Sequence, residues 1–176
     1  MKFAYADPPY LGCGKKFYDK HHPDARIWDS IEAHEQLIER LSEFDGWAMS
    51  LSSTSLRRIL PLCPEGVRVA SWVKPFAVFK KGVNPVYAWE PVIFYGARKR
   101  GLEVEHCKDW VAANITMKKG LPGAKPKAFC DWILELLGVD ENDEFHDLFP
   151  GTDSMSDALL RRRGKGWIQS PLFDRK

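Results

Sequence analysis

The sequence predicts an α/β fold in a single domain that covers residues 1–176. Strand-like and helix-like patterns alternate along the chain, and no internal repeat or low-complexity linker interrupts them. The composition, 44% hydrophobic and 28% charged over 176 residues, suits one soluble globular domain with its own core. Two separate domains are therefore not expected.

The composition also argues against several classes of protein. No uninterrupted apolar run approaches the roughly 20 residues of a membrane span, and no signal peptide precedes the first strand, so we expect a cytoplasmic protein without a membrane partner. The four cysteines never form a C-x-x-C pair, so we expect neither a metal site nor a disulfide framework. The net charge of +2 is too small to indicate a nucleic-acid binder by itself.

The first elements follow from local patterns. Phe3–Ala6 is typical of a short buried strand, and the polar segment Leu11–Trp28 of a long loop. Asp29 followed by Glu32 matches a capping box, and apolar residues then recur at helical spacing. These signals predict a helix that runs to Gly46.

The middle of the chain predicts one short helix and three strands. The helix begins at Ser53 or Thr54 and continues to Leu60, where prolines end it. Short apolar runs predict the strands Trp47–Leu51, Val67–Val73 and Pro91–Phe94.

The last third predicts two helices and one clear strand. Pro126 begins a helix with one apolar face, and Gly138 suits a left-handed cap at its end. Glu144–Leu148 is typical of a strand, and Ser154–Arg163 of a helix. A final short strand is expected at Trp167–Gln169.

Two of these strands are followed by unusual loops. Asp7-Pro8-Pro9-Tyr10 comes after the first strand, and Phe149-Pro150-Gly151-Thr152 comes after the strand at Glu144–Leu148. Ligands of open α/β sheets bind beyond the carboxyl ends of the strands. If the two strands are neighbours, one crevice receives both loops.

The loop at Asp7 suits a planar amine. The Asp7 carboxylate and the Pro8 carbonyl, on a backbone stiffened by Pro8 and Pro9, are acceptors for the two hydrogens of an exocyclic amino group. Tyr10 supplies a ring on which a base stacks, once that base is unpaired or flipped out of a duplex. Taken alone, however, this sequence is more often a plain turn.

The combination of motifs resembles the amino-methylating DNA methyltransferases, which transfer a methyl group from S-adenosylmethionine to adenine N6 or cytosine N4. Asp7 to Tyr10 matches the DPPY form of their catalytic signature, and Asp147 to Asp153 matches D-x-F-x-G-x-G except for its last glycine. Lys125-Pro126 is similar to their K-P element. The resemblance implies a cofactor site made of Lys125, Pro126, Asp147, Phe149, Gly151, Thr152 and Asp153.

The resemblance also implies an architecture. The catalytic motif precedes the cofactor motif, as in the circularly permuted group, and the chain looks most like small phage-encoded members, which act in the host cytoplasm. We expect a Rossmann-like methyltransferase fold, permuted and truncated, without a target recognition domain. We further expect a homodimer that shields a poorly covered sheet edge.

The function implied is methylation of DNA at adenine N6 with low sequence specificity, with cytosine N4 as the alternative. The loops Leu11–Trp28 and Lys74–Trp89 and the basic stretch Arg161–Lys165 are the expected DNA contacts. Asp153, at the place of the last glycine, either crowds the cofactor or binds its ammonium group, and it also suggests an inert nucleic-acid-binding subunit. One aromatic set lines a base channel or belongs to the core: Trp72, Phe76, Phe79, Tyr87 and Trp89.

Overall fold

The computed structural model describes residues 1–15, 23–76, 81–103, 105–116 and 124–163. Six strands form one sheet: β1 (Lys2–Ala6), β2 (Gly46–Ser50), β3 (Arg68–Val73), β4 (Trp89–Tyr95), β5 (Trp110–Ala112) and β6 (Glu144–Asp147). Their order in the sheet is β5-β3-β4-β2-β1-β6. Predicted elements that fall outside these residues include the strand at Trp167–Gln169.

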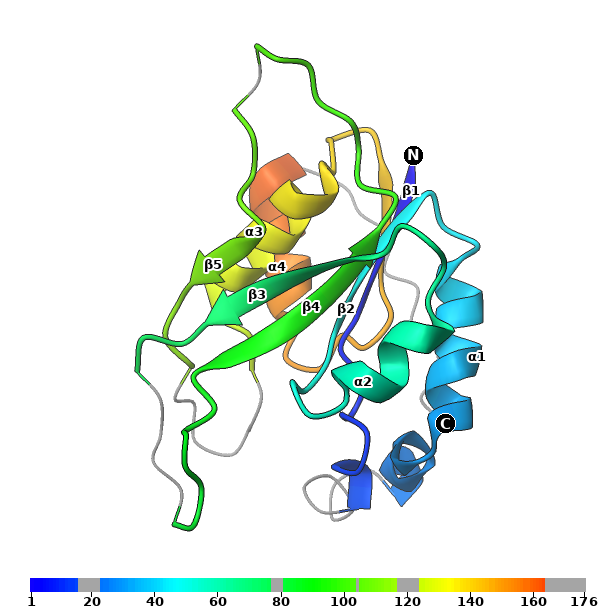
Figure 1. Cartoon of the computed structure of the whole chain (residues 1–176). Helices are drawn as coiled ribbons and strands as arrows, with labels where there is room; N and C mark the ends of the chain where they lie inside the picture. Colours follow the sequence, from blue (N-terminus) through cyan, green and yellow to red (C-terminus); the bar gives the residue numbers. More distant parts are fainter. Residues whose placement is uncertain (16–22, 77–80, 104, 117–123, 164–176) are drawn as a thin grey trace.

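Helices connect the strands. The α-helices are α1 (Ile31–Leu41), α2 (Leu56–Ile59), α3 (Lys127–Leu137) and α4 (Ser154–Arg163), and the 3-10 helices are η2 (Pro23–Asp29) and η3 (Leu60–Leu62). Helices α1 and α2 cover one face of the sheet, and α3 and α4 cover the other (Figure 1). The α/β prediction is therefore confirmed.

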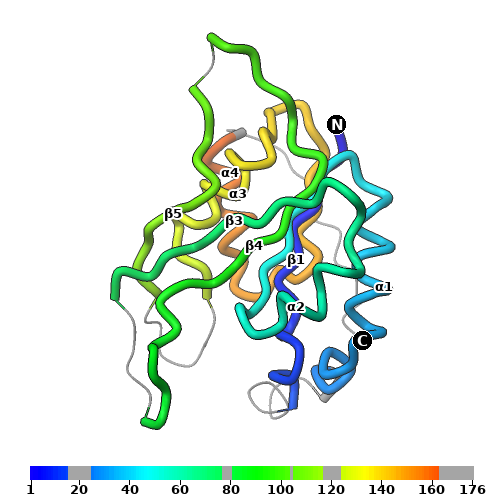
Figure 2. The backbone as a smooth tube through the Cα atoms, viewed as in Figure 1, coloured from blue at the N-terminus to red at the C-terminus, as the bar shows by residue number. Residues whose placement is uncertain are grey.

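The sheet is parallel on one side and mixed on the other. β1 pairs in parallel with both β2 and β6, whereas β4 is antiparallel to β2 and β3. Because parallel strands end at the same edge, the chain leaving β1 and the chain leaving β6 emerge together. Figure 2 shows the described part of the β3–β4 connection projecting at this same end of the sheet.

The alternation of side chains in β1 feeds two cores. Phe3 and Tyr5 point to the face covered by α3, where Phe129 is fully buried. Ala4 and Ala6 point to the opposite face, where small side chains allow the apolar stripe of α1 to approach. This alternation directs the next odd position, Asp7, toward the α3 face.

The caps of the two long helices differ in how well the sequence predicts them. Gly138 ends α3 at φ 70°, as predicted, and a Cβ there would also lie 2.8 Å from Arg98 Cβ. The capping box at Asp29 and Glu32 is wrong, because Ser30 caps α1 and accepts from the N–H of Ala33 at 3.2 Å. The Asp29 carboxylate instead accepts from the backbone N–H groups of residues 14 and 15.

Several element bounds also differ from the predictions. α1 stops at Leu41 and not near Gly46, which is the first residue of β2. Gly46 packs against the backbone of Gly96, and a Cβ on Gly46 would lie 2.4 Å from the Gly96 carbonyl oxygen. The expected loop Leu11–Trp28 contains η2, and the expected helix to Leu60 is one α-helical turn followed by η3. β5 was missed because three residues are too few for a pattern of alternation.

No helix within the described ranges is both long and apolar enough to span a membrane.

Candidate active site

Two carboxyl groups lie at the carboxyl ends of β1 and β6. Tyr5 pairs with Asp147 across the two strands, and the Leu148 N–H donates to the Tyr5 carbonyl at 2.9 Å, so Asp7 follows directly beside the turn that leaves β6. The two strands predicted to share a crevice are therefore neighbours. Asp147 is buried and Asp7 is partly buried.

Lys125 lies on the Asp7 carboxylate. Its ammonium donates to Oδ1 at 2.7 Å and to Oδ2 at 2.6 Å, from a side chain that is only 9% exposed. The rings of Tyr10, Trp72 and Phe129 surround this ammonium, with centroids 5.7 to 5.9 Å away. The ammonium is therefore held by both a charge and aromatic faces, and it fixes the orientation of Asp7.

Tyr10 is tied to β4. Its hydroxyl donates to Oε2 of Glu90 at 2.7 Å, and the Lys74 ammonium forms an ion pair with Oε1 of the same carboxylate. Lys125 also approaches the Tyr10 hydroxyl, at 3.4 Å. Two carboxylates and two ammonium groups thus form one network around the tyrosine.

Burial and charge shift the titration of these groups. Burial raises the pKa of Asp7, and the Lys125 ammonium opposes that rise. Burial also raises the pKa of Glu90, but the ammonium groups of Lys125 and Lys74 outweigh it, so the net change is downward. Tyr10 has a pKa well above its usual value because of burial and the two neighbouring carboxylates, and it stays a neutral donor.

Asp147 is a strongly perturbed carboxyl group of the predicted site. Its side chain is buried on β6, and burial raises its pKa to about 7, against the hydrogen bond that it accepts from the Phe149 N–H at 3.2 Å. The charges of Asp7 and Asp153 raise it further. Near neutral pH this carboxyl group is therefore only partly ionised, in contrast to Glu90.

The turn after β6 has the backbone of a glycine turn. Gly151 has φ 47°, and Asp153 has φ 58°, a left-handed conformation that glycine adopts more readily than other residues. The Asp153 N–H donates to the Pro150 carbonyl at 2.7 Å and closes the turn. The conformation expected for the missing glycine is therefore present although the glycine is not.

The other residues assigned to the cofactor lie at several places in the fold. Pro126 is the N-cap of α3 and directly follows Lys125. The Thr152 hydroxyl is hydrogen-bonded to the Ser154 hydroxyl at 2.8 Å. The Phe149 ring packs edge-on against Trp28 at 5.1 Å, on the α1 side of the sheet and away from Lys125.

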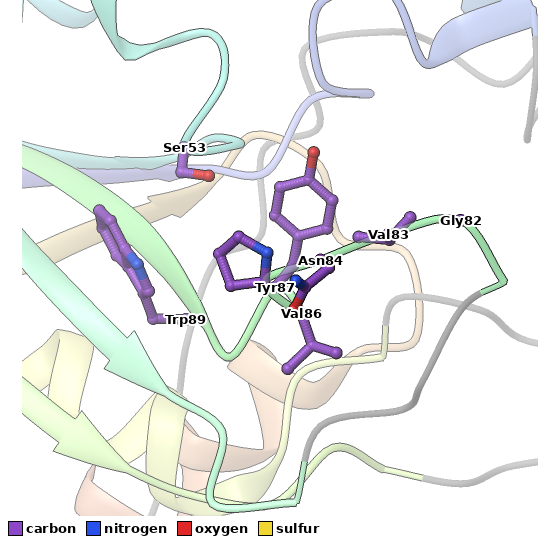
Figure 3. A pocket seen from close by; sticks show the side chains of 8 residues that line it. Ser53, Gly82, Val83, Asn84, Val86, Tyr87 and Trp89 are labelled. Atoms are coloured by element: carbon purple, nitrogen blue, oxygen red, sulfur yellow. The ribbon is translucent and has the colours of Figure 1, made fainter.

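The aromatic residues expected to line a base channel or to belong to the core do not all have the same place in the structure. Trp72 is 3% exposed and belongs to the core, whereas Phe76, Tyr87 and Trp89 are 58%, 54% and 40% exposed. Tyr87 and Trp89 line a pocket of about 370 Å³ together with Ser53 from the loop after β2 (Figure 3). Phe79 lies outside the described residues.

The basic stretch at the end of α4 is occupied by contacts with α3. Arg161 pairs with Asp131 at 3.0 Å and Arg162 with Glu135 at 3.1 Å. These two side chains therefore serve helix packing, while residues 164 and 165 lie outside the described part, as do residues 16–22 of the Leu11–Trp28 loop. Of the expected DNA contacts, the loop after β3 carries the exposed aromatic surface.

Glu90 and Lys74 were not assigned by the sequence. The signal is an acidic residue between Trp89 and Pro91 at the start of an otherwise apolar run, where a lone charge needs a partner. Their pairing depends on β3 and β4 being antiparallel neighbours, which places Lys74, just after β3, near Glu90. Among the described residues, no group of three metal-ligating side chains comes together.

The sequence matches no known family model and no curated protein. Solved structures do match in fold: M1.HpyAVI in complex with SAM has a TM-score of 0.63 at 14% identity, over 97% of this chain and 82% of that chain. A protein from Thermus thermophilus, provisionally described as a DNA modification methylase and complexed with S-adenosyl-L-methionine, has a TM-score of 0.52 at 14% identity, over 99% and 82%. These matches confirm the predicted Rossmann-like fold, which is the fold of S-adenosylmethionine-dependent methyltransferases. At such low identities the likeness establishes the fold alone.

Proposed function

We propose that this protein is an S-adenosylmethionine-dependent DNA methyltransferase that modifies an exocyclic amino group, adenine N6 before cytosine N4. The observation that carries the proposal is the Asp7 carboxylate, fixed by Lys125 at the end of β1 with the Tyr10 ring beside it. The fold and the order of the two motifs support it.

The chain supplies acceptors for the amine. Each carboxylate oxygen has two lone pairs, so Asp7 accepts from the base while it stays bound to Lys125. The Pro8 carbonyl accepts no hydrogen bond from the described residues and is the second acceptor. Drawing both N–H groups toward these oxygens takes the nitrogen lone pair out of conjugation with the ring, and so prepares it for attack.

The transfer is direct and in line, without a covalent intermediate on the protein. When bound, the cofactor supplies the electrophilic methyl group. The chain contributes position and charge. Two of its thiols are poor nucleophiles, because burial raises the pKa of Cys63 to about 11 and that of Cys130 to about 12.

The turn after β6 fits the cofactor. Gly151 leaves its own Cβ position open except for a backbone oxygen at 3.6 Å, which permits a close approach of a ligand to the backbone. The site proposed for the methionine ammonium group includes the buried Asp147, which is partly ionised near neutral pH, and the exposed Asp153, which either binds this group or crowds the cofactor. We assign Lys125, Pro126, Asp147, Phe149, Gly151, Thr152 and Asp153 to this site.

We propose that DNA binds across the carboxyl end of β1, with the target base unpaired or flipped. Tyr87 and Trp89 offer flat surfaces for stacking, and few side chains here suit reading several base edges. Backbone contacts should therefore dominate, so that affinity falls steeply with salt and modification spreads over sites that share one to three bases.

Mass spectrometry of nucleosides from DNA of cells that express the protein tests this proposal. N6-methyladenine is expected, and N4-methylcytosine would select the alternative. Unmodified DNA, together with no transfer in vitro, would contradict the proposal. Mapping of the modified bases tests specificity, and one defined motif of five or more base pairs would overturn the claim that it is low.

A second function is favoured by Asp153, whose side chain stands where the motif has glycine. In this alternative the chain is an inert, methyltransferase-like subunit that binds nucleic acid. Calorimetric titration with S-adenosylmethionine separates the two, since an inert subunit shows no saturable binding whereas the enzyme does.

The assembly and origin stay predictions. β6 is an edge strand of the described sheet, and we propose a homodimer that covers it. A monomer in light scattering would contradict this assembly. We propose that the enzyme has the circularly permuted motif order, is encoded by a phage and acts in the host cytoplasm.

A further inference from the structure

Glu90 reaches the candidate active site from β4, which lies beyond β2 on the side of β1 away from β6. β4 runs antiparallel to β2, so its first residues lie at the edge where β1 and β2 end. Glu90 is the second residue of β4, and its side chain is 22% exposed. An acidic group at this place has access to the residues that leave β1.

The two oxygens of Glu90 have different partners. Oε2 accepts from the Tyr10 hydroxyl at 2.7 Å, and Oε1 pairs with the Lys74 ammonium. The ion pair fixes the carboxylate, and the carboxylate fixes the tip of the tyrosine ring. Residues 7–10 have no regular secondary structure, and the other charged group at the ring is the Lys125 ammonium, 3.4 Å from the Tyr10 hydroxyl and 5.7 Å from the ring centroid.

We propose that Glu90 is a positioning residue of the proposed methyl transfer, which orients the Tyr10 ring so that the stacked base presents its amine to Asp7. This inference rests on the proposed function. Glu90 acts through Tyr10 and does not itself touch the reacting atoms. Lys74 positions Glu90 in turn, so a strand pair remote in sequence controls the catalytic loop.

The charge of the network supports this role. Burial alone would raise the pKa of Glu90, but Lys125 and Lys74 lower it overall, so the carboxylate is ionised at neutral pH. A hydrogen bond from a neutral phenol to an ionised carboxylate is stronger than one between neutral groups. The bond therefore holds the ring firmly enough to matter for a reaction that depends on orientation.

A double-variant experiment on the full chain tests the proposal. Four variants are compared with the wild type: Glu90→Gln, Glu90→Ala, Tyr10→Phe and the double variant Tyr10→Phe/Glu90→Ala. Methyl transfer from labelled S-adenosylmethionine to unmethylated genomic DNA gives kcat and KM, and circular dichroism checks the fold. Glu135→Ala is the control, because it removes a carboxylate that pairs with Arg100 and Arg162 on α4's side of the molecule.

We expect Glu90→Ala to lower kcat about 10- to 100-fold, because a misplacement near 1 Å has effects of this size. Glu90→Gln keeps an acceptor for the Tyr10 hydroxyl and should retain at least a third of the wild-type kcat, roughly, since orientation survives. The double variant should be no slower than the slower single variant, since both changes break one contact. Glu135→Ala should match the wild type.

Three results would overturn the role of Glu90: a kcat of Glu90→Ala within twofold of the wild type, losses that multiply in the double variant, or Glu90→Gln as slow as Glu90→Ala. Should Glu90→Ala fail to fold, Glu90→Met, which keeps the length without an acceptor, replaces it with the same expectation. An inactive wild-type chain overturns the proposed function itself, and so differs from all three results.

Discussion

The loop after β1 and the turn after β6 leave neighbouring strands at one edge of the sheet, but different contacts fix them. Asp7 and Tyr10 are bound by side chains from distant elements, Lys125 before α3 and Glu90 on β4. The turn from Phe149 to Asp153 is closed by its own backbone, through the bond from the Asp153 N–H to the Pro150 carbonyl.

This difference separates two kinds of preorganisation. A loop that must present polar side chains at a defined angle needs partners that approach from several directions. A turn that must present its backbone to a ligand needs only the right φ values, which glycine or aspartate supplies locally. Changes in the first loop should therefore act on catalysis, and changes in the second on cofactor affinity.

The largest effect is expected from Asp7→Ala. The variant removes an acceptor needed mainly in the transition state, and we expect a loss of transfer on the order of 10²-fold or more with the fold and cofactor binding intact. Single-turnover transfer and calorimetry measure the two quantities. The control is Asp131→Ala, which removes an α3 aspartate paired with Lys127 and Arg161, and its activity should match that of the wild type.

A variant that keeps more than about a tenth of the wild-type rate would contradict the role of Asp7, because a preorganised contact of this type contributes more. Loss of cofactor binding together with activity would show that Asp7 acts on cofactor affinity, as expected for the turn after β6, and not on catalysis alone.

Asp147→Asn is expected to change the dependence of stability on pH. Folding raises the pKa of Asp147 to about 7, so between pH 4 and 7, roughly, the folded chain binds more protons than the unfolded chain and stability falls as pH rises. Asparagine removes this contribution and retains an oxygen for the Phe149 N–H. Above pH 7 the variant should be more stable, on the order of 4 kcal/mol, because the pKa shift of roughly three units contributes about 1.4 kcal/mol per unit.

Urea unfolding at a series of pH values measures this effect. Below the usual range of an aspartate, the two proteins should have similar free energies of unfolding, since Asp147 is then protonated in both states. Parallel curves for wild type and variant across the whole range would refute the assignment.

The smallest effect is expected from Asp153→Gly. Because Asp153 already has φ 58°, glycine fits the same backbone with less strain, and the free energy of unfolding should change by about 1 kcal/mol or less. Calorimetry with S-adenosylmethionine then separates the two roles of the side chain. Tighter binding indicates that Asp153 crowds the cofactor, and weaker binding that it holds the ammonium group. Unchanged affinity would remove Asp153 from the cofactor site.

Much of this molecule follows from the sequence by itself. A short apolar run predicted β1, the proline and glycine signals predicted both ends of α3, and the loops after β1 and β6 carry motifs that local chemistry explains. These features depend on neighbours within a few residues, where backbone geometry and side-chain type decide the outcome.

Only the tertiary structure decided which groups meet. The separation of Asp7 and Lys125 by 118 positions and of Tyr10 and Glu90 by 80 positions leaves no local pattern from which to predict their contacts. The same holds for Ser30, which replaced Asp29 as the cap of α1 because the Asp29 carboxylate binds the backbone of residues 14 and 15. Pairing of β4 with β2 and β3 brings Glu90 and Lys74 to the loop after β1, since strand order is set by the burial of both sheet faces and not by any one segment.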